Sequence, residues 1–558
     1  MIIFRTENFF NAKKNFSAFS LTAIKNFAKV YNKILFERRI VVFKDLTRRD
    51  FIKATSMTAL AMTVPINVFA ADNCTVKTRY GTFNGFVDKQ GVKTWLGIPY
   101  AQPPVKNLRW QAPQPLKSSD KTFDAKKFGF AAMQSVDERE TASIRPQSED
   151  CLTLNIWRRS EKKNLPVMVF IPGGGFQTGG SSDIRYHGSN FAAANDVVLV
   201  TINYRLNVFG FLNLASIDSA FEDSGYLGIK DQVAALKWVK ENIAAFGGNP
   251  DNITIFGQSA GSTSVMLLTI TPAAKNLFQK AIPQSGHLGL YNTPEESAKV
   301  AEIFMEMSGA KTIGDLMKKS SAELINIYEK VNSLNLDTSL LNYMPTCDGK
   351  FIPGDPFKAL KDGGAREIKF LTGTTSDEWC FWLSYTGYKF FETLRANSRF
   401  VLAKYNGTAT PEEIYRKWLE NRPDTEENYI NFVNNADWRV GQEVAAEYQS
   451  KFNDVYYYLF TESADDKLRS YHGIDLVYTF NLPDKNFNPN PAPNLVKQVQ
   501  TSWAAFAATG NPNNEFIPHW EKYSVNNRQT MELNSKGCVC HKDLNTDNLN
   551  SLRYVYEN

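Results

Sequence analysis

The sequence predicts an α/β protein built on a large, mostly parallel central sheet with helices on both faces. Short, continuous apolar runs alternate with longer stretches of helical spacing, the pattern of β-α-β units. No repeat and no glycine- and serine-rich linker divides residues 75–558. Of the 558 residues, 43% are hydrophobic and 22% charged, which excludes a disordered, collagen-like or coiled-coil chain.

The expected strands are short and mostly apolar, as strands buried on both faces are. Four runs fit this description, at residues 166–171, 197–202, 253–256 and 369–372. Between the second and third runs, residues 227–246 carry apolar side chains at helical spacing and end at Gly247-Gly248, a helix stop. Residues 291–345 have a mainly helical pattern, and we expect them to cap the sheet.

The positive charge of the chain is concentrated at its N-terminus. The net charge is +5, but residues 1–70 hold 12 Lys and Arg against 4 Asp and Glu, so residues 71–558 hold 51 basic and 54 acidic residues. The predicted folded body is therefore nearly neutral. A nucleic-acid partner, which needs a basic surface, is not expected.

The N-terminal segment has the three parts of a secretory signal. Arg48-Arg49 stands in a charged region, residues 54–71 are uncharged, and Ala70-Ala71 ends that run with small side chains. The arginine pair resembles the bacterial twin-arginine type, which is read by a receptor. We expect export through the twin-arginine translocation machinery, cleavage after Ala70, and a periplasmic or secreted protein.

The alternative for residues 54–71 is a membrane anchor, because 18 uncharged residues nearly span a bilayer. Thr55, Pro65 and Asn67 make the run too polar for a stable anchor, and no other long apolar run follows. We therefore expect no membrane span after cleavage. The predicted division is an N-terminal extension with its signal peptide at residues 1–70 and one folded domain at 71–558. Residues 1–46 exceed what a signal needs, which favours a later translation start.

The candidate nucleophile is Ser259, in the pattern G-x-S-x-G formed by residues 257–261. The pattern follows the expected strand at 253–256 and precedes an apolar helical run at 264–268. A strand that turns sharply into a helix needs glycine on both sides of the serine, and the turn lifts the hydroxyl above the sheet. The alternative, an ordinary Gly/Ser turn, leaves this placement unexplained.

A serine hydroxyl needs a base to accept its proton. In folds with this elbow the chain order is Ser, acid, His, which leaves His472, His519 and His541. His472 lies in a loop-like entry to an apolar segment and is the preferred base. His519 reads as a packed surface residue, and His541 lies in a polar run near the end.

Two adjacent carboxylates are candidates for the residue that orients the base. Glu378 follows the strand at 369–372 and precedes an aromatic helix start, and loops at the carboxyl ends of strands are where α/β folds place catalytic groups. Asp377 is equally suitable by chemistry alone, although it could cap the helix instead.

The glycine-rich turn Pro172–Phe176 completes the candidate site. No G-K-[ST] or G-x-G-x-x-G follows, so a nucleotide site is not expected. With an elbow in the same chain, the triple glycine suits an oxyanion hole made of backbone N–H groups. Cys538-Val539-Cys540 has no second Cys/His pair at zinc-site spacing, so a zinc site is not expected. Because a serine nucleophile with a base needs neither a metal nor an organic cofactor, we expect none.

Together these motifs resemble the type-B carboxylesterase family, which includes the cholinesterases. The resemblance runs from about Gly81 to Tyr523 and includes the segments Gly97–Ala101, Glu149–Asn155, Asn203–Arg205, Phe246–Pro250, Gly373–Glu378 and Trp503–Asn513. It implies the α/β-hydrolase fold with helical cap insertions. It also implies a triad of Ser259, Glu378 and His472, oxyanion donors at Gly174, Gly175 and Ala260, and a structural ion pair between Arg109 and Glu149.

The chain departs from the family pattern at three places. Ala132 stands where relatives often carry the cysteine that pairs with the equivalent of Cys151, so we expect Cys151 to be free. Gln258 precedes the serine where many relatives carry Glu. Residues 133–150 contain no Trp, Tyr or Phe, so the aromatic choline platform of the cholinesterases is absent.

The leading functional hypothesis is an exported serine hydrolase that cleaves a small-molecule carboxylic ester through an acyl-enzyme. An amidase, a carbamate hydrolase or an acyltransferase would use the same site with another leaving group or acceptor. A non-catalytic binding member of the family is a weaker alternative, because such relatives usually lose triad residues and this chain keeps all three. The sequence leaves the physiological ester open.

Overall fold

The computed structural model describes residues 74–135, 144, 146–334, 342–386, 411–544 and 549–553. The expected signal peptide lies outside these ranges. Its boundary with the body at residue 70 therefore stays a prediction. Within the described ranges, no helix combines the length and the apolar character that a membrane span requires.

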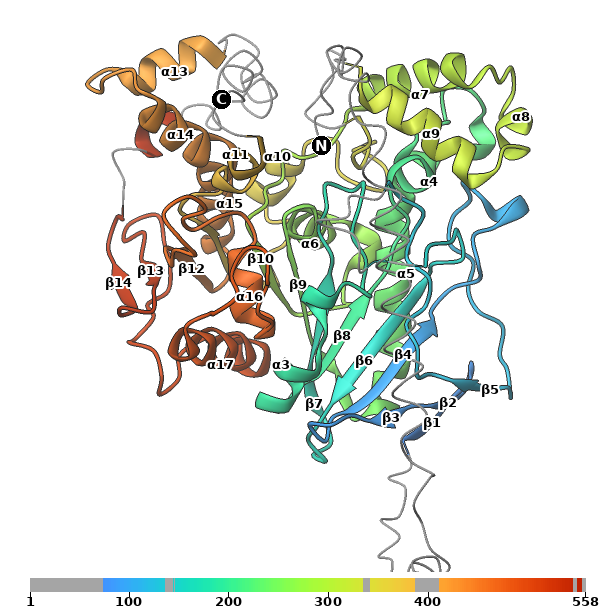
Figure 1. The fold of residues 1–558 in the computed structure, drawn as a ribbon, viewed down its shortest axis with the longest axis horizontal. Coiled ribbons are helices and arrows are strands. Elements are labelled where there is room, and N and C mark those ends of the chain that lie inside the picture. Colours follow the sequence, from blue (N-terminus) through green and yellow to red (C-terminus); the bar gives the residue numbers. More distant parts are fainter. Residues whose placement is uncertain are drawn as a thin grey trace, which may run out of the picture. The chain divides into compact units, whose positions relative to one another are not determined.

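A mixed sheet organises the described part of the chain (Figure 1). Its eleven described strands follow the order β14-β13-β12-β11-β10-β9-β7-β8-β6-β4-β3. The seven from β13 to β8 are parallel, and antiparallel strands flank them, which confirms the expected mostly parallel sheet. The bounds are β3 (Phe86–Val87), β4 (Lys93–Pro99), β6 (Thr153–Arg158), β7 (Leu165–Ile171), β8 (Val198–Ile202), β9 (Gly248–Gln258), β10 (Lys280–Gln284), β11 (Lys369–Thr375), β12 (Val455–Phe460), β13 (Thr530–Leu533) and β14 (Val539–His541). A separate small sheet joins β1 (Thr75–Thr78), β2 (Gly81–Asn84) and β5 (Thr122–Asp124).

The four expected strands are present as β7, β8, β9 and β11, and β7 shows how each face of the sheet is covered. Val167, Val169 and Ile171 belong to one hydrophobic cluster, whereas Met168 and Phe170 belong to another. Successive side chains of a strand point to opposite faces. The sheet is therefore buried on both sides, as its mostly apolar runs predict.

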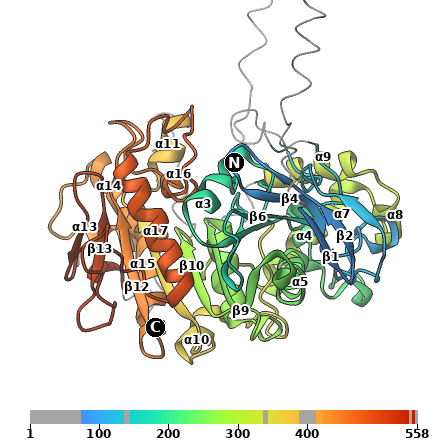
Figure 2. The same ribbon diagram turned by 90° about the horizontal axis from the view of Figure 1, so that it is seen from below.

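Helices supply the two clusters that cover the sheet. The first cluster takes in α5 (Leu227–Asn242), α6 (Ala260–Ile270) and α15 (Val440–Ser450). The second takes in α3 (Ser189–Ala194), α16 (Ile474–Phe480) and α17 (Pro493–Thr509), which group together in Figure 2. The expected helix at 227–246 is α5 followed by the 3₁₀ turn η6 (Ile243–Phe246), and it ends at Gly247 with φ of 88°.

Two helical insertions leave the sheet at its carboxyl edge (Figure 1). The first follows β10 and contains α7 (Pro294–Ser308), α8 (Ile313–Met317) and α9 (Ser321–Asn332), which confirms the helical expectation for the described part of 291–345. Each starts with a capping box, at Thr293, Thr312 and Ser320. The second follows β11 and contains α11 (Cys380–Thr386), α13 (Pro411–Leu419), α14 (Glu426–Asn434) and the π-helix η9 (Asn435–Arg439).

Short elements complete the described chain. They are α4 (Asn207–Phe211), α10 (Pro356–Lys361), and the 3₁₀ turns η2 (Lys106–Leu108), η3 (Ile184–Tyr186), η4 (Ser219–Phe221), η5 (Ser224–Tyr226) and η7 (Pro272–Ala274).

Buried ion pairs tie distant segments together. The expected pair is present: Arg109 donates to both carboxylate oxygens of Glu149, at 2.8 and 2.5 Å. Arg109 also donates to the carbonyl of Lys319 at 2.9 Å, which joins this pair to the first insertion. Cys151, two residues after Glu149, is a buried free thiol, and burial raises its pKa.

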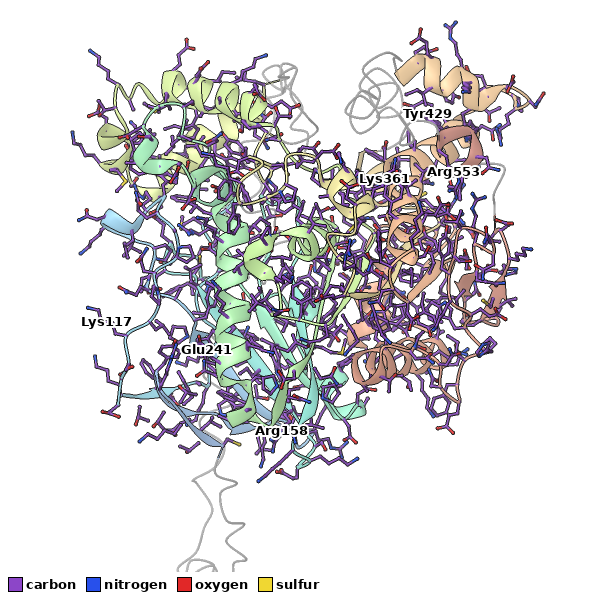
Figure 3. The ribbon with its side chains drawn as sticks, turned by 180° about the vertical axis from the view of Figure 1, so that it is seen from behind. Lys117, Arg158, Glu241, Lys361, Tyr429 and Arg553 are labelled. Carbon is purple, nitrogen blue, oxygen red and sulfur yellow. The ribbon has the colours of Figure 1, made fainter. Side chains whose placement is uncertain are left out.

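A second buried ion pair fixes the C-terminal segment. Arg553, labelled in Figure 3, donates to Glu443 of α15 at 2.7 Å and also binds Glu447. Arg158, labelled in the same view at the end of β6, donates to the carbonyl of Phe246 at 3.0 Å. Both contacts join segments that are far apart in the chain.

Candidate active site

Ser259 lies in the sharp turn that the sequence predicts. β9 ends at Gln258 and α6 begins at Ala260, so Ser259 alone joins strand to helix. Its φ of 59° and ψ of −128° are unusual for a residue with a side chain, and such backbone strain costs about 1–3 kcal/mol. Ser259 N–H donates to the carbonyl of Gln284 at 3.0 Å, which holds the turn against β10.

The glycines of the pattern are needed because the turn packs tightly against β7. A Cβ added at Gly261 would lie 2.1 Å from the carbonyl oxygen of Ile171. A Cβ added at Gly257 would lie 2.7 Å from the carbonyl oxygen of Gly261. Both distances are far below van der Waals contact. The elbow therefore forms only with glycine at these positions.

The imidazole of His472 lies against Glu378. The Glu378 Oε2 and His472 Nδ1 atoms are 2.5 Å apart, and Glu378 is fully buried. The second carboxylate oxygen, Oε1, accepts the backbone N–H of Thr375 at 2.9 Å. Both oxygens are thus engaged, and the short contact places a proton on Nδ1 of the imidazole.

Asp377, the alternative acid, is engaged elsewhere. Its carboxylate accepts the hydroxyl of Ser376 and lies 3.6 Å from Arg469. The geometry therefore brings Glu378, and not Asp377, to the imidazole. The other candidate histidines lie elsewhere: His541 Nε2 is 2.9 Å from Glu532 Oε2 on the neighbouring strand β13, and His519 is exposed.

Two indoles hold the His472 ring. The ring centroid of Trp438 lies 4.3 Å from that of His472, and the ring centroid of Trp382 lies 4.9 Å away. Trp438 comes from the π-helix η9 and Trp382 from α11, so both residues belong to the second insertion. Trp438 was not predicted from the sequence, because nothing in its local pattern indicates that a π-helix turns it toward His472.

Nε2 of His472 has a hydrogen-bond partner other than the serine. It lies 3.0 Å from Nε2 of Gln258, and no hydrogen bond joins Ser259 Oγ to His472 in the ranges that the structure describes. Because Nδ1 carries the proton, Nε2 of the neutral ring is the acceptor and the Gln258 amide is the donor. Gln258 thus contacts a predicted site residue. Its position next to Ser259 in sequence was the available signal.

The predicted oxyanion residues lie beside the elbow. A Cβ added at Gly173 would be 3.1 Å from Cβ of Ser259, so the glycine-rich turn touches the serine. Gly174 and Gly175 have φ of 115° and 63°, and in the described chain neither N–H donates a hydrogen bond. Ala260 is the first residue of α6, so its N–H has no intrahelical acceptor. This turn and the helix start can together receive an oxyanion.

Two further buried carboxyls have raised pKa values, and one of them, Asp475, interacts electrostatically with His472. Burial raises the pKa of Asp475 to about 6, opposed by hydrogen bonds from Gln284 and Tyr458. Burial raises the pKa of Asp437 to about 7, opposed by the indole N–H of Trp379. Among the described residues, no three His, Cys, Asp or Glu side chains are grouped to hold a metal ion.

Comparisons with known proteins identify the family of the chain. Residues 72–552 match the model of the carboxylesterase family. The chain is 36% identical over 492 residues to the para-nitrobenzyl esterase of Bacillus subtilis, covering 83% of this chain and 95% of that protein. It is 32% identical to an acetylcholinesterase of Bungarus fasciatus, with 83% of each chain covered.

Solved structures agree as well. A carboxylesterase of Geobacillus stearothermophilus superposes with a TM-score of 0.76 at 33% identity, covering 86% of this chain and all of that one. A match of this extent carries the family assignment. The chain belongs to the carboxylesterase family and is a carboxylic ester hydrolase.

Proposed function

We propose that the protein is an exported serine esterase that works through an acyl-enzyme, with Ser259 as nucleophile, His472 as base and Glu378 as the group that orients the base. The contact between Glu378 Oε2 and His472 Nδ1 carries this proposal. It leaves Nε2 of the imidazole as the acceptor, at the sheet edge from which the Ser259 elbow rises.

In the first half-reaction, Ser259 Oγ attacks the ester carbonyl while its proton passes to Nε2 of His472. Glu378 stabilises the resulting imidazolium through the buried Nδ1–H contact. His472 then gives the proton to the departing alcohol oxygen, which leaves an acyl group on Ser259. In the second half-reaction, His472 takes a proton from water as the water oxygen attacks the acyl carbon. His472 then gives that proton to Ser259 Oγ as the acyl–Oγ bond breaks, which releases the carboxylic acid.

The tetrahedral intermediates carry a negative oxygen that needs donors. The N–H groups of Gly174, Gly175 and Ala260 are the proposed oxyanion hole, because the two glycine N–H groups have no acceptor in the described chain and the third begins α6. Each such donor contributes about 2.7–4 kcal/mol to transition-state stabilisation in comparable sites. No metal or organic cofactor takes part in this sequence of steps.

Other reactions differ from ester hydrolysis at this site only in leaving group or acceptor. An amide or carbamate would require protonation of a poorer leaving group, and an acyltransferase would replace water by another hydroxyl. The relatives named above as esterases favour the ester. A non-catalytic binding role is disfavoured by the Glu378–His472 contact, which a binding module would not need.

Export is proposed from Arg48-Arg49 and the uncharged run at residues 54–71, which resemble a twin-arginine signal. The mature protein would begin near Ala71 and act in the periplasm or outside the cell.

The experiment uses purified residues 71–558 and a panel of p-nitrophenyl and natural esters. Wild-type protein should turn over esters, and Ser259→Ala should lose nearly all activity without losing thermal stability. Ser262→Ala is the matched control, because Ser262 lies on the same helix and is not a candidate nucleophile. Equal turnover by wild type and Ser259→Ala would refute the proposal.

A further inference from the structure

We propose that Gln258 is a positioning residue: its amide occupies the Nε2 lone pair of His472 in the resting enzyme and must be displaced before that nitrogen can accept the proton of Ser259. This inference rests on the proposed role of His472 as the base. It adds a residue whose side chain acts on the base rather than on the substrate. The observation behind it is the 3.0 Å contact between Gln258 Nε2 and His472 Nε2.

The amide of Gln258 is held in this position by its surroundings. Gln258 is the last residue of β9 and is buried. A Cβ added at Gly473 would lie 3.4 Å from Gln258 Nε2, and one added at Gly173 would lie 3.4 Å from Gln258 Oε1. The amide thus fits between two glycines, one after the base and one before the proposed oxyanion hole, with its nitrogen toward the imidazole.

The chemistry of the imidazole explains which end of the amide faces it. Glu378 holds the proton on Nδ1, so the neutral ring offers a single lone pair, on Nε2. An amide N–H can donate to that lone pair, whereas a carboxylate at the same place cannot. Glu at position 258, which many relatives carry, would instead favour the protonated ring.

Occupation of Nε2 accounts for the missing contact with the nucleophile. In the described chain Ser259 Oγ makes no hydrogen bond to His472, whose Nε2 is 3.0 Å from the amide of Gln258, the residue before Ser259. The lone pair that should accept the serine proton is already in use. Breaking this hydrogen bond before Ser259 can react lowers the rate of reaction of Ser259 about twofold to tenfold, relative to an enzyme in which Nε2 is unoccupied.

Other groups around the imidazole do not change when Gln258 is replaced. The charged or titratable groups that face it are Glu378, from the turn after β11, and Asp475, from α16. Trp382 of α11 and Trp438 of η9 contribute uncharged rings, with Asp437 next to Trp438. A difference in pH profile between variants at position 258 therefore reports on Gln258 itself.

The test compares Gln258→Met and Gln258→Glu with the wild type, using the second-order rate of Ser259 phosphonylation and the pH profile of kcat/KM. Methionine keeps the length of the side chain and removes the donor, so the phosphonylation rate and kcat/KM should rise about twofold to tenfold. Glutamate should move the acid limb of kcat/KM upward by about one to three pH units, because a carboxylate favours the imidazolium.

Gln232→Met is the matched control. Gln232 is a fully buried glutamine on α5 whose amide donates to Ser264 at 3.0 Å, so its replacement reports the general cost of losing a buried amide. The rate should stay unchanged in this control. If Gln258→Met folds poorly, as judged by its Tm, the pH profile of Gln258→Glu carries the test.

The inference would be overturned if folded Gln258→Met were phosphonylated no faster than the wild type. It would also be overturned if Gln258→Glu left the acid limb of the kcat/KM profile at its wild-type pH. Loss of activity in Ser259→Ala, measured alongside, separates the two proposals. If that variant is inactive and the Gln258 variants behave like the wild type, only the inference about Gln258 fails.

Discussion

Replacing Glu378 by Gln should lower kcat far more than replacing its neighbour Asp377 by Asn. In the wild type, Glu378 Oε1 accepts the N–H of Thr375 at 2.9 Å and Oε2 contacts His472 Nδ1 at 2.5 Å. A glutamine must keep its oxygen on the Thr375 N–H, so its NH₂ group must face the imidazole. That group donates to Nδ1 and drives the proton to Nε2, which can then no longer accept the proton of Ser259.

The expected loss follows from this wrong tautomer together with the lost charge. In serine hydrolases of the Ser-His-Asp type, the equivalent carboxylate-to-amide change lowers kcat by about ten-thousandfold, or about 5.5 kcal/mol. Asp377→Asn should cost less than about tenfold, because its carboxylate faces Ser376 and Arg469 and not the imidazole.

The assay is single-turnover acylation by p-nitrophenyl butyrate at pH 8, with Tm measured for each variant to exclude unfolding. A larger loss in Asp377→Asn than in Glu378→Gln would refute the reasoning. So would a Glu378→Gln enzyme that keeps a tenth or more of the wild-type kcat.

Four further predictions concern the oxyanion hole, stability, substrate charge and export. Gly174→Ala should lower kcat by about 10²–10³, because the added Cβ would lie 2.2 Å from the carbonyl oxygen of Thr178. The control is Gly91→Ala, at a glycine that also has positive φ but faces open space, and it should leave kcat unchanged. Arg109→Met should lower the free energy of unfolding in urea by about 3–5 kcal/mol, because it leaves the buried carboxylate of Glu149 unpaired; no change would show that the pair is dispensable. The kcat/KM for butyrylcholine should exceed that for a neutral isosteric butyrate ester by less than about tenfold, or about 1.4 kcal/mol, because residues 133–150 lack aromatic side chains and Gln258 is uncharged. A larger preference for the choline ester would point to Trp382 as the residue that binds the cation. Arg48→Lys with Arg49→Lys should retain the precursor in the cytoplasm, seen by cell fractionation, and undiminished export would favour the general secretory route.

Four strands of the sheet could be predicted from sequence because they are locally encoded. The runs at 166–171 and 197–202 match β7 and β8 to within one residue, since a strand buried on both faces must be mostly apolar. β9 was foreseen only for its second half. Its first half, from Gly248, contains Asn249, Pro250 and Asp251, whose polar and turn-forming character hides the pairing with β7.

The elbow at Ser259 was predictable for the same local reason, since strand, glycines and helix follow one another. The choice between Asp377 and Glu378 was not, because adjacent carboxylates have the same chemistry and only the turn after β11 decides which one faces His472. The contacts of His472 with Gln258 and Trp438 join residues far apart in the chain. The contact with Trp438 depends on how the second insertion folds back over the sheet, and the contact with Gln258 depends on the order of the strands in the sheet. No local pattern encodes either one.

The most direct test of the proposed mechanism is the site of covalent labelling by a fluorophosphonate. The reagent phosphonylates a serine only where a base activates it. We expect one label, on the peptide that carries Ser259, formed in step with the loss of esterase activity and absent from Ser259→Ala. A label on another serine, or full esterase activity with no label on Ser259, would contradict the account.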